Sequence, residues 1–93
     1  MSYKIAISDR AQAGIDKHKK SGNKSLIQKI FKLLLEVAEH PRTGTGQVEH
    51  LKGYTDREMW SRRIDQKHRL VYEIKDDELI VIAVSTYGHY DDK

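Results

Sequence analysis

The sequence contains no cysteine, and this absence excludes two kinds of small protein. Without thiols the chain has neither a disulfide framework nor a thiolate zinc site. Long apolar runs are also missing, since no stretch approaches the roughly 18 residues that a membrane-spanning helix requires. The opening segment MSYKIAISDR lacks the apolar core of a signal peptide. We therefore expect a cytoplasmic protein that does not contact a membrane.

Metal-binding patterns are missing as well. The five histidines are scattered and no HExxH pattern occurs, so we predict no metal site and no cofactor. With 93 residues, of which 38% are hydrophobic and 33% are charged, the chain has material for one modest core. We therefore predict a single domain over residues 1–93.

The net charge of +3 is unevenly distributed along the chain. Residues 1–32 carry eight Lys or Arg side chains against two Asp, whereas residues 33–93 carry nine basic and twelve acidic side chains. A basic N-terminal third suits binding to a phosphate backbone, and it equally suits plain solvation. Composition alone favours the solvated surface.

Hydrophobic periodicity predicts a short strand and two helices in the first half of the chain. The segment 3–7 is typical of a strand, and Ser8 is a helix N-cap signal before a thin apolar stripe over 9–20. Apolar residues at helical spacing then predict the main core-facing helix over 25–40. Pro41, the only proline, ends this helix.

Three strand patterns follow, over residues 59–64, 69–74 and 79–84. The first two alternate between their faces, and the third, LIVIAV, is apolar on both, as expected of an inner strand. Short polar connections between them predict an antiparallel meander. The predicted fold is therefore α+β, in the order β-α-α-β-β-β, with a small antiparallel sheet packed on two N-terminal helices.

The predicted meander gathers basic side chains at one edge. Its turn at 65–68 sets Arg63 and Arg69 nearly opposite each other on neighbouring strands. Two isolated arginines would simply extend into solvent, but a convergent set of guanidinium groups is what an anionic substrate such as a phosphate requires. Three further basic side chains are predicted near this edge: Arg62, Lys67 and His68.

The chain leaves its last predicted strand at this same edge, through the segment STYGHY at 85–90. We therefore expect His89 and Tyr90 to arrive near the two arginines. RNA cleavage by its own 2′-hydroxyl needs a base, cations that stabilise the phosphorane, and an acid for the leaving 5′-oxygen. His89 suits the acid because histidine titrates near neutral pH. The sequence offers three candidates for the base: Glu49, His50 and His68.

Two other aromatic residues have simpler interpretations. Trp60 could stack on a nucleotide base, but packing in the core or at the sheet edge is favoured for a tryptophan in a strand. Tyr87 is predicted to anchor the end of the last strand rather than to contact RNA.

The segments VEHLKG and WSRRIDQKHRLVYEI, together with the terminal GHY, resemble the YoeB/Txe family of RelE-like toxins from bacterial type II toxin–antitoxin pairs. The resemblance is strong over residues 45–90 and extends over 1–40 only in the order of the helices. It implies a RelE-like fold and a ribosome-dependent mRNA endonuclease. Such a toxin enters the ribosomal A site and cuts the codon there by 2′-hydroxyl attack, without a metal ion.

The resemblance also implies roles for individual residues. Glu49 would be the general base, His89 the general acid, and Tyr90 would orient the nucleotide. Relatives often have proline where His50 stands, and the tail continues past Tyr90 as Asp-Asp-Lys where many relatives end. The cations at the scissile phosphate would be Lys52, Arg63 and Arg69, with Arg69 taking part in catalysis.

The partners implied by the resemblance are the ribosome with its mRNA, a YefM-like antitoxin and a second copy of the chain. A disordered acidic segment of the antitoxin would fold onto the toxin and neutralise its charge. The alternative is a RelE/ParE-like protein that poisons a protein target without cleavage, or a plain RNA-binding domain. Binders of the first kind generally lack the His-Tyr ending, which therefore favours cleavage.

Overall fold

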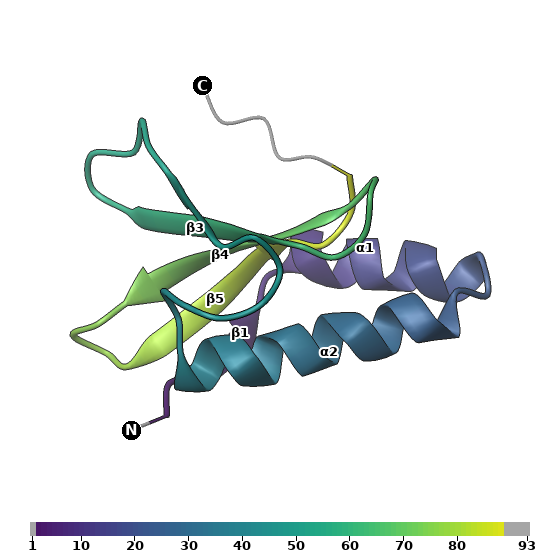
Figure 1. Ribbon diagram of the computed structural model, residues 1–93, viewed down its shortest axis with the longest axis horizontal. Helices are drawn as coiled ribbons and strands as arrows, with labels where there is room; N and C mark the ends of the chain where they lie inside the picture. The colour runs from purple at the N-terminus through teal and green to yellow at the C-terminus, as the bar shows by residue number, and fades with distance from the viewer. Residues whose placement is uncertain (1, 89–93) are drawn as a thin grey trace.

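The structure is a computed structural model that describes residues 2–88 (Figure 1). The predicted His89 and Tyr90 therefore lie outside the described residues. Two helices precede a strand meander, which confirms the predicted α+β class. The elements in chain order are β1 (Lys4–Ile7), α1 (Asp9–Lys20), α2 (Lys24–Glu39), β2 (Glu49–Leu51), β3 (Glu58–Arg63), β4 (Arg69–Lys75) and β5 (Ile80–Ser85).

The five strands form one sheet in the order β1-β5-β4-β3-β2. The central meander β3-β4-β5 is antiparallel, as predicted. The whole sheet is mixed, however, because β1 pairs with β5 in parallel. A second difference is β2, which the sequence did not predict and which pairs antiparallel with β3. A strand of three residues is too short to show an alternating pattern, so only its pairing reveals it.

Both helices cover one face of the sheet, and within residues 2–88 no helix covers the opposite face (Figure 1). Each helix begins at a side-chain cap: Ser8 accepts a hydrogen bond from Ala11 N, and Asn23 accepts one from Leu26 N. Helical spacing of apolar residues then turns one stripe of each helix toward the sheet. The hydrophobic core between these layers includes Ala11, Ile15, Ile30, Leu34, Val37, Leu70, Tyr72 and Val81.

Alternation along the strands decides which side chains point to the face of the sheet opposite the helices. Leu70 and Tyr72 of β4 belong to the core on the helix side. The residues at odd positions of β4, beginning with Arg69, therefore point to the face that carries no helix. Over residues 2–88, neither helix is long and apolar enough to span a membrane.

Candidate active site

Arg69 is the centre of the candidate site. It begins β4 and lies directly opposite Arg63 of β3, which confirms the predicted register. Its Nε donates a hydrogen bond to Ser61 Oγ at 3.0 Å, and its Nη2 donates one to the carbonyl oxygen of Gln47 at 3.0 Å. Two hydrogen bonds on different nitrogens fix the plane of the guanidinium, so Arg69 is held in place before any substrate arrives.

Glu49 forms an ion pair with this fixed guanidinium. Its Oε1 lies 3.8 Å from Arg69 Nη2, and its side chain is 65% exposed. Glu49 pairs with Ser61 across β2 and β3, which puts a carboxylate, a hydroxyl and a guanidinium on neighbouring strands of one face. A cavity of about 250 Å³ lies here, lined by Gln47, Val48, Glu49 and Arg69.

Arg63 and Lys52 occupy different places relative to this pair. Arg63 is half-buried at the end of β3, and its Nε donates to the carbonyl oxygen of Asp65 at 3.3 Å. Lys52 is exposed and follows β2 directly. The register of β2 runs from Glu49 at Ser61 toward the start of β3, so Lys52 continues away from Arg63. The structure therefore brings Arg63 to Arg69 but does not bring Lys52 to them.

The two histidines that were alternative bases have other surroundings. His50 stacks on Trp60, with ring centroids 4.6 Å apart and an interplanar angle of 17°. Because neighbouring residues of a strand point to opposite faces, His50 faces away from the side that carries Glu49. Trp60 is partly buried against the hydrophobic core, which confirms its predicted packing role, and its Nε1 donates a hydrogen bond to Glu58 Oε2 at 2.9 Å. The ring of His68 packs against those of His18 and Tyr87.

The segment after β5 reaches the arginine edge, as the meander predicted. The backbone N–H of Arg69 donates to the carbonyl oxygen of Gly88 at 3.1 Å. Two residues earlier, the buried Thr86 donates its hydroxyl to the carbonyl oxygen of Ala11 at 2.7 Å. His18 of α1, also buried, lies with Nε2 3.0 Å from the carbonyl oxygen of Thr86. The tail, residues 86–88, is therefore held between α1 and β4, and we call this set of contacts the α1–tail anchor.

Tyr87 packs against two imidazole rings and a lysine side chain in the α1–tail anchor. Its ring centroid lies 5.1 Å from that of His18 and 4.8 Å from that of His68. Lys17 Nζ lies 4.7 Å from the same ring centroid, a cation–π contact. These contacts confirm the prediction that Tyr87 anchors the end of the last strand.

Gly14 of α1 allows this close approach. A Cβ atom built at Gly14 would lie 2.4 Å from Thr86 Oγ1 and 3.1 Å from Tyr87 Cβ. Alanine normally stabilises a helix interior over glycine by about 1 kcal/mol. Gly14→Ala is nevertheless expected to destabilise the protein by about 1–3 kcal/mol, since overpacking must displace the tail. Urea denaturation monitored by circular dichroism measures this change.

The exposed Ala13 provides the matched comparison for Gly14. Ala13→Gly tests helix propensity alone and should cost about 1 kcal/mol. A Gly14→Ala variant that is more stable than the wild type would show that the tail does not lie against α1.

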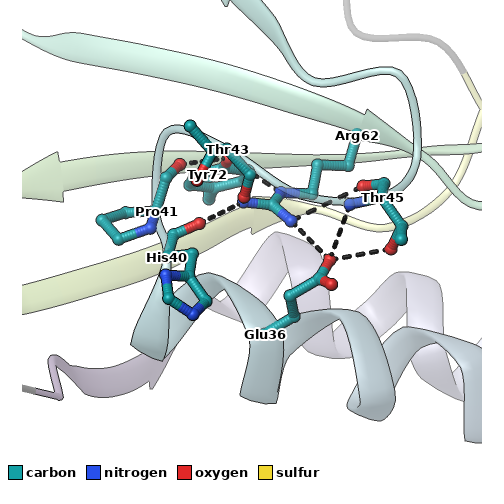
Figure 2. A network of polar contacts seen from close by, with 7 residues as sticks. All are labelled: Glu36, His40, Pro41, Thr43, Thr45, Arg62 and Tyr72. Atoms are coloured by element: carbon teal, nitrogen blue, oxygen red, sulfur yellow. Dashed lines mark hydrogen bonds and ion pairs between the residues drawn. The ribbon is translucent and has the colours of Figure 1, made fainter.

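The prediction that Arg62 adds a basic side chain to this edge is wrong. Arg62 is 0% exposed and its guanidinium points toward α2, where Nη1 lies 2.7 Å from Glu36 Oε1 (Figure 2). Neighbouring residues on a strand face opposite sides, so Arg62 turns to the helices where Arg63 turns away from them. Its other nitrogens donate to Tyr72 Oη and to the carbonyl oxygens of His40 and Thr43.

Arg62 instead holds the connection between α2 and β2. Residues 42–47 of this connection lie across its guanidinium (Figure 2), and the N–H of Arg63 adds a hydrogen bond to Gly46 O. Two residues near the end of this connection contact Arg69. Gln47 does so through its carbonyl oxygen, and Glu49, the first residue of β2, through its carboxylate. Arg62 is therefore a structural support for the candidate site.

Two residues that hold Arg69 were missed at the level of sequence. Ser61 lies on the same face as Arg63, and its small hydroxyl carries no motif of its own. Gln47 contributes a backbone carbonyl, which depends on backbone conformation and not on residue type; its φ is 50°. Within residues 2–88 no group of three or more His, Asp or Glu side chains is arranged to hold a metal ion.

Comparison with known proteins decides the family. The sequence model of the YoeB-like toxin of bacterial type II toxin–antitoxin systems matches residues 15–90. The chain belongs to this family. Toxin YoeB of Streptomyces coelicolor is 38% identical over 65 residues, which cover 70% of this chain and 76% of that protein. Toxin YoeB of Escherichia coli is 39% identical over 61 residues, covering 66% and 71%.

Solved structures share the fold of this YoeB-like toxin over almost its whole length. A YoeB/ParE toxin from Agrobacterium tumefaciens superposes with a TM-score of 0.82 at 26% identity, covering 94% of this chain and 99% of the other. A YoeB dimer from Staphylococcus aureus gives a TM-score of 0.80 at 28% identity, covering 97% and 100%. These likenesses confirm the predicted RelE-like architecture.

Proposed function

We propose that this YoeB-like toxin is a metal-independent, ribosome-dependent mRNA endonuclease that cuts in the A site and so inhibits translation. The observation that carries the proposal is the pairing of the exposed Glu49 carboxylate with the fixed guanidinium of Arg69, 3.8 Å apart. A proton acceptor beside a prepositioned cation suits attack by a 2′-hydroxyl on the adjacent phosphate.

The proposed reaction uses side chains alone and needs no metal ion. Glu49 takes the proton from the 2′-hydroxyl, and the 2′-oxygen forms a bond to phosphorus. Arg69, assisted by Arg63 on the neighbouring strand, neutralises the charge that develops on the phosphorane oxygens. The bond to the 5′-oxygen then breaks as an acid protonates it. The products are a 2′,3′-cyclic phosphate, which can open to a 3′-phosphate, and a 5′-hydroxyl.

His89 is the acid in this proposal, and Tyr90 orients the nucleotide by stacking or by a hydrogen bond. Support comes from the residue that precedes them, because Gly88 is tied to the backbone of Arg69 by a hydrogen bond of 3.1 Å. Gly88, the last described residue, therefore lies at the edge that carries the guanidinium. Histidine is suited to donating a proton near neutral pH.

A YefM-like antitoxin and a second copy of the chain are the proposed protein partners. Solved structures from Staphylococcus aureus include a YoeB-YefM complex at 30% identity to this chain and a YoeB dimer at 28% identity. Because its proposed site of action is the ribosome, we propose that the protein acts in the cytoplasm. The alternative function, binding and poisoning a protein target without cleavage, does not use the Glu49–Arg69 pair.

Mapping of mRNA ends by primer extension, with and without ribosomes, tests the proposal. We expect cuts within codons of translated mRNA, 5′-hydroxyl ends on the downstream fragments, and no cuts when ribosomes are left out. Cuts on naked RNA would indicate a free ribonuclease. Inhibited growth or translation without cuts would favour poisoning of a protein target, and RNA retention without cuts a plain RNA-binding domain.

A further inference from the structure

Gly88 is held through both of its backbone polar groups. Its N–H donates to His68 Nδ1 at 2.7 Å, and its carbonyl oxygen accepts from the N–H of Arg69 at 3.1 Å. The φ angle of Gly88 is 70°, in the left-handed region that glycine adopts without steric cost. Two consecutive residues of the sheet edge thus fix the conformation of the last residue that the structure describes.

His68 is itself firmly placed by its turn. The carboxylate Oδ1 of Asp65 accepts hydrogen bonds from the N–H groups of Lys67 and His68, both at 2.8 Å. The carbonyl oxygen of His68 accepts from Ile64 N at 2.9 Å. Although burial raises the pKa of Asp65, the hydrogen bonds from Lys67 and His68 outweigh it and hold this pKa below its usual range. Asp65 therefore stays ionised and keeps the turn closed at neutral pH.

The imidazole of His68 is oriented by the rings around it. The ring of His18 meets it edge to face at 4.7 Å between centroids, and the ring of Tyr87 lies at 4.8 Å. Because the peptide N–H of Gly88 can only donate, Nδ1 of His68 must present its lone pair. The role of His68 in this contact is therefore that of a hydrogen-bond acceptor at a fixed point.

We propose that His68 is a positioning residue for RNA cleavage, acting through Gly88 on the residues that follow it. The inference rests on the proposed function, in which His89 donates a proton. Neighbouring Cα atoms are held about 3.8 Å apart, so a displacement of Gly88 is passed on to the residue bonded to it. A displacement of about 1 Å at a reacting group can lower a rate by about 10²-fold. His68 contacts no reacting atom in this scheme.

Two variants separate the acceptor from the ring. His68→Phe keeps an aromatic ring against His18 and Tyr87 but has no acceptor for Gly88. His68→Asn loses the ring but carries an oxygen close to the position of Nδ1. We expect His68→Phe to lower the single-turnover rate at saturating ribosome complex by about 10- to 100-fold, with half-saturation unchanged. His68→Asn should recover most of this loss.

Hydrogen exchange at the Gly88 amide, followed by NMR, reports the same contact without any substrate. Exchange should be slow in the wild type and in His68→Asn, and fast in His68→Phe. His40→Phe is the matched control, because His40 is exposed and its ring lies outside the polar contacts around Arg62 (Figure 2). This control should cut mRNA and protect Gly88 as the wild type does.

The outcomes distinguish the positioning role of His68 from the proposed function. A wild type that cuts translated mRNA together with an equally active His68→Phe overturns the positioning role. A His68→Asn variant as slow as His68→Phe overturns the acceptor role and leaves only ring packing. A wild type that does not cut overturns the proposed function, and with it any role for His68 in cleavage.

Discussion

Replacing Arg69 with alanine is expected to slow cleavage of translated mRNA by about 10²–10³-fold, the range observed when one preorganised donor to a developing negative charge is removed. Arg69 is held by Ser61 and by the carbonyl oxygen of Gln47, so its guanidinium is ready before the phosphorane forms. Alanine removes this charge and leaves Glu49 without its cation. Primer extension on stalled ribosome complexes, with single-turnover rates, measures the loss.

Two further variants sharpen the Arg69 result. Arg69→Lys keeps the charge but lacks the planar fork that reaches both Ser61 and Gln47, so its rate should lie between those of alanine and arginine. Arg42→Ala removes an arginine that pairs with Glu58, outside the candidate site, and should leave the cleavage rate unchanged. Wild-type cleavage by Arg69→Ala would contradict the proposed phosphate role.

Arg62→Met is expected to lower the free energy of unfolding by about 3–5 kcal/mol, because Glu36 loses its cation and the carbonyl oxygens of His40 and Thr43 lose their buried donor, at about 1–3 kcal/mol for each unsatisfied group. The guanidinium of Arg62 is fully buried and binds Glu36, Tyr72 and loop carbonyl oxygens (Figure 2). The hydrogen bond from the Thr45 hydroxyl is the largest cause that lowers the pKa of Glu36, and Arg62 lowers it further. Because the Thr45 bond remains in the variant, the carboxylate stays charged after Arg62 is removed. Urea denaturation gives the difference in unfolding free energy.

A partly exposed arginine serves as the control for burial. Arg57 lies 3.2 Å from Glu73 and its side chain is 40% exposed. Arg57→Met should change stability by no more than about 1 kcal/mol, because Lys75 Nζ remains 3.9 Å from the same carboxylate. Equal losses of unfolding free energy in the Arg57 and Arg62 variants would show that burial does not increase the contribution of Arg62 to stability.

The sequence predicted those parts of the fold that local patterns control. Helical spacing of apolar residues located α1 and α2, and the short turn at 65–68 fixed the register of Arg63 against Arg69. The parallel pairing of β1 with β5 joins segments from opposite ends of the chain. No local pattern specifies such a contact, and the three residues of β2 are too few to show one.

The candidate site was only partly predictable, for reasons that differ between residues. Residue patterns gave Glu49 as one of three bases, and its place beside Arg69 depends on β2, which the patterns did not predict. Arg62 was misplaced because a cluster of charges in the sequence says nothing about which of them is buried. The contact between His68 and Gly88 depends on how the tail crosses the turn. The roles of His89 and Tyr90 stay predictions.

Because β1 pairs with β5, the first strand of the chain has no partner until the last strand has been synthesised. The hydrogen bond from Ser8 Oγ to the carbonyl oxygen of Val84 joins residues 76 positions apart. Contacts of such sequence separation form late, since a long loop must close first. A growing chain therefore lacks both a complete sheet and the α1–tail anchor. The fold of this toxin therefore cannot be complete before residues 80–88 have been synthesised.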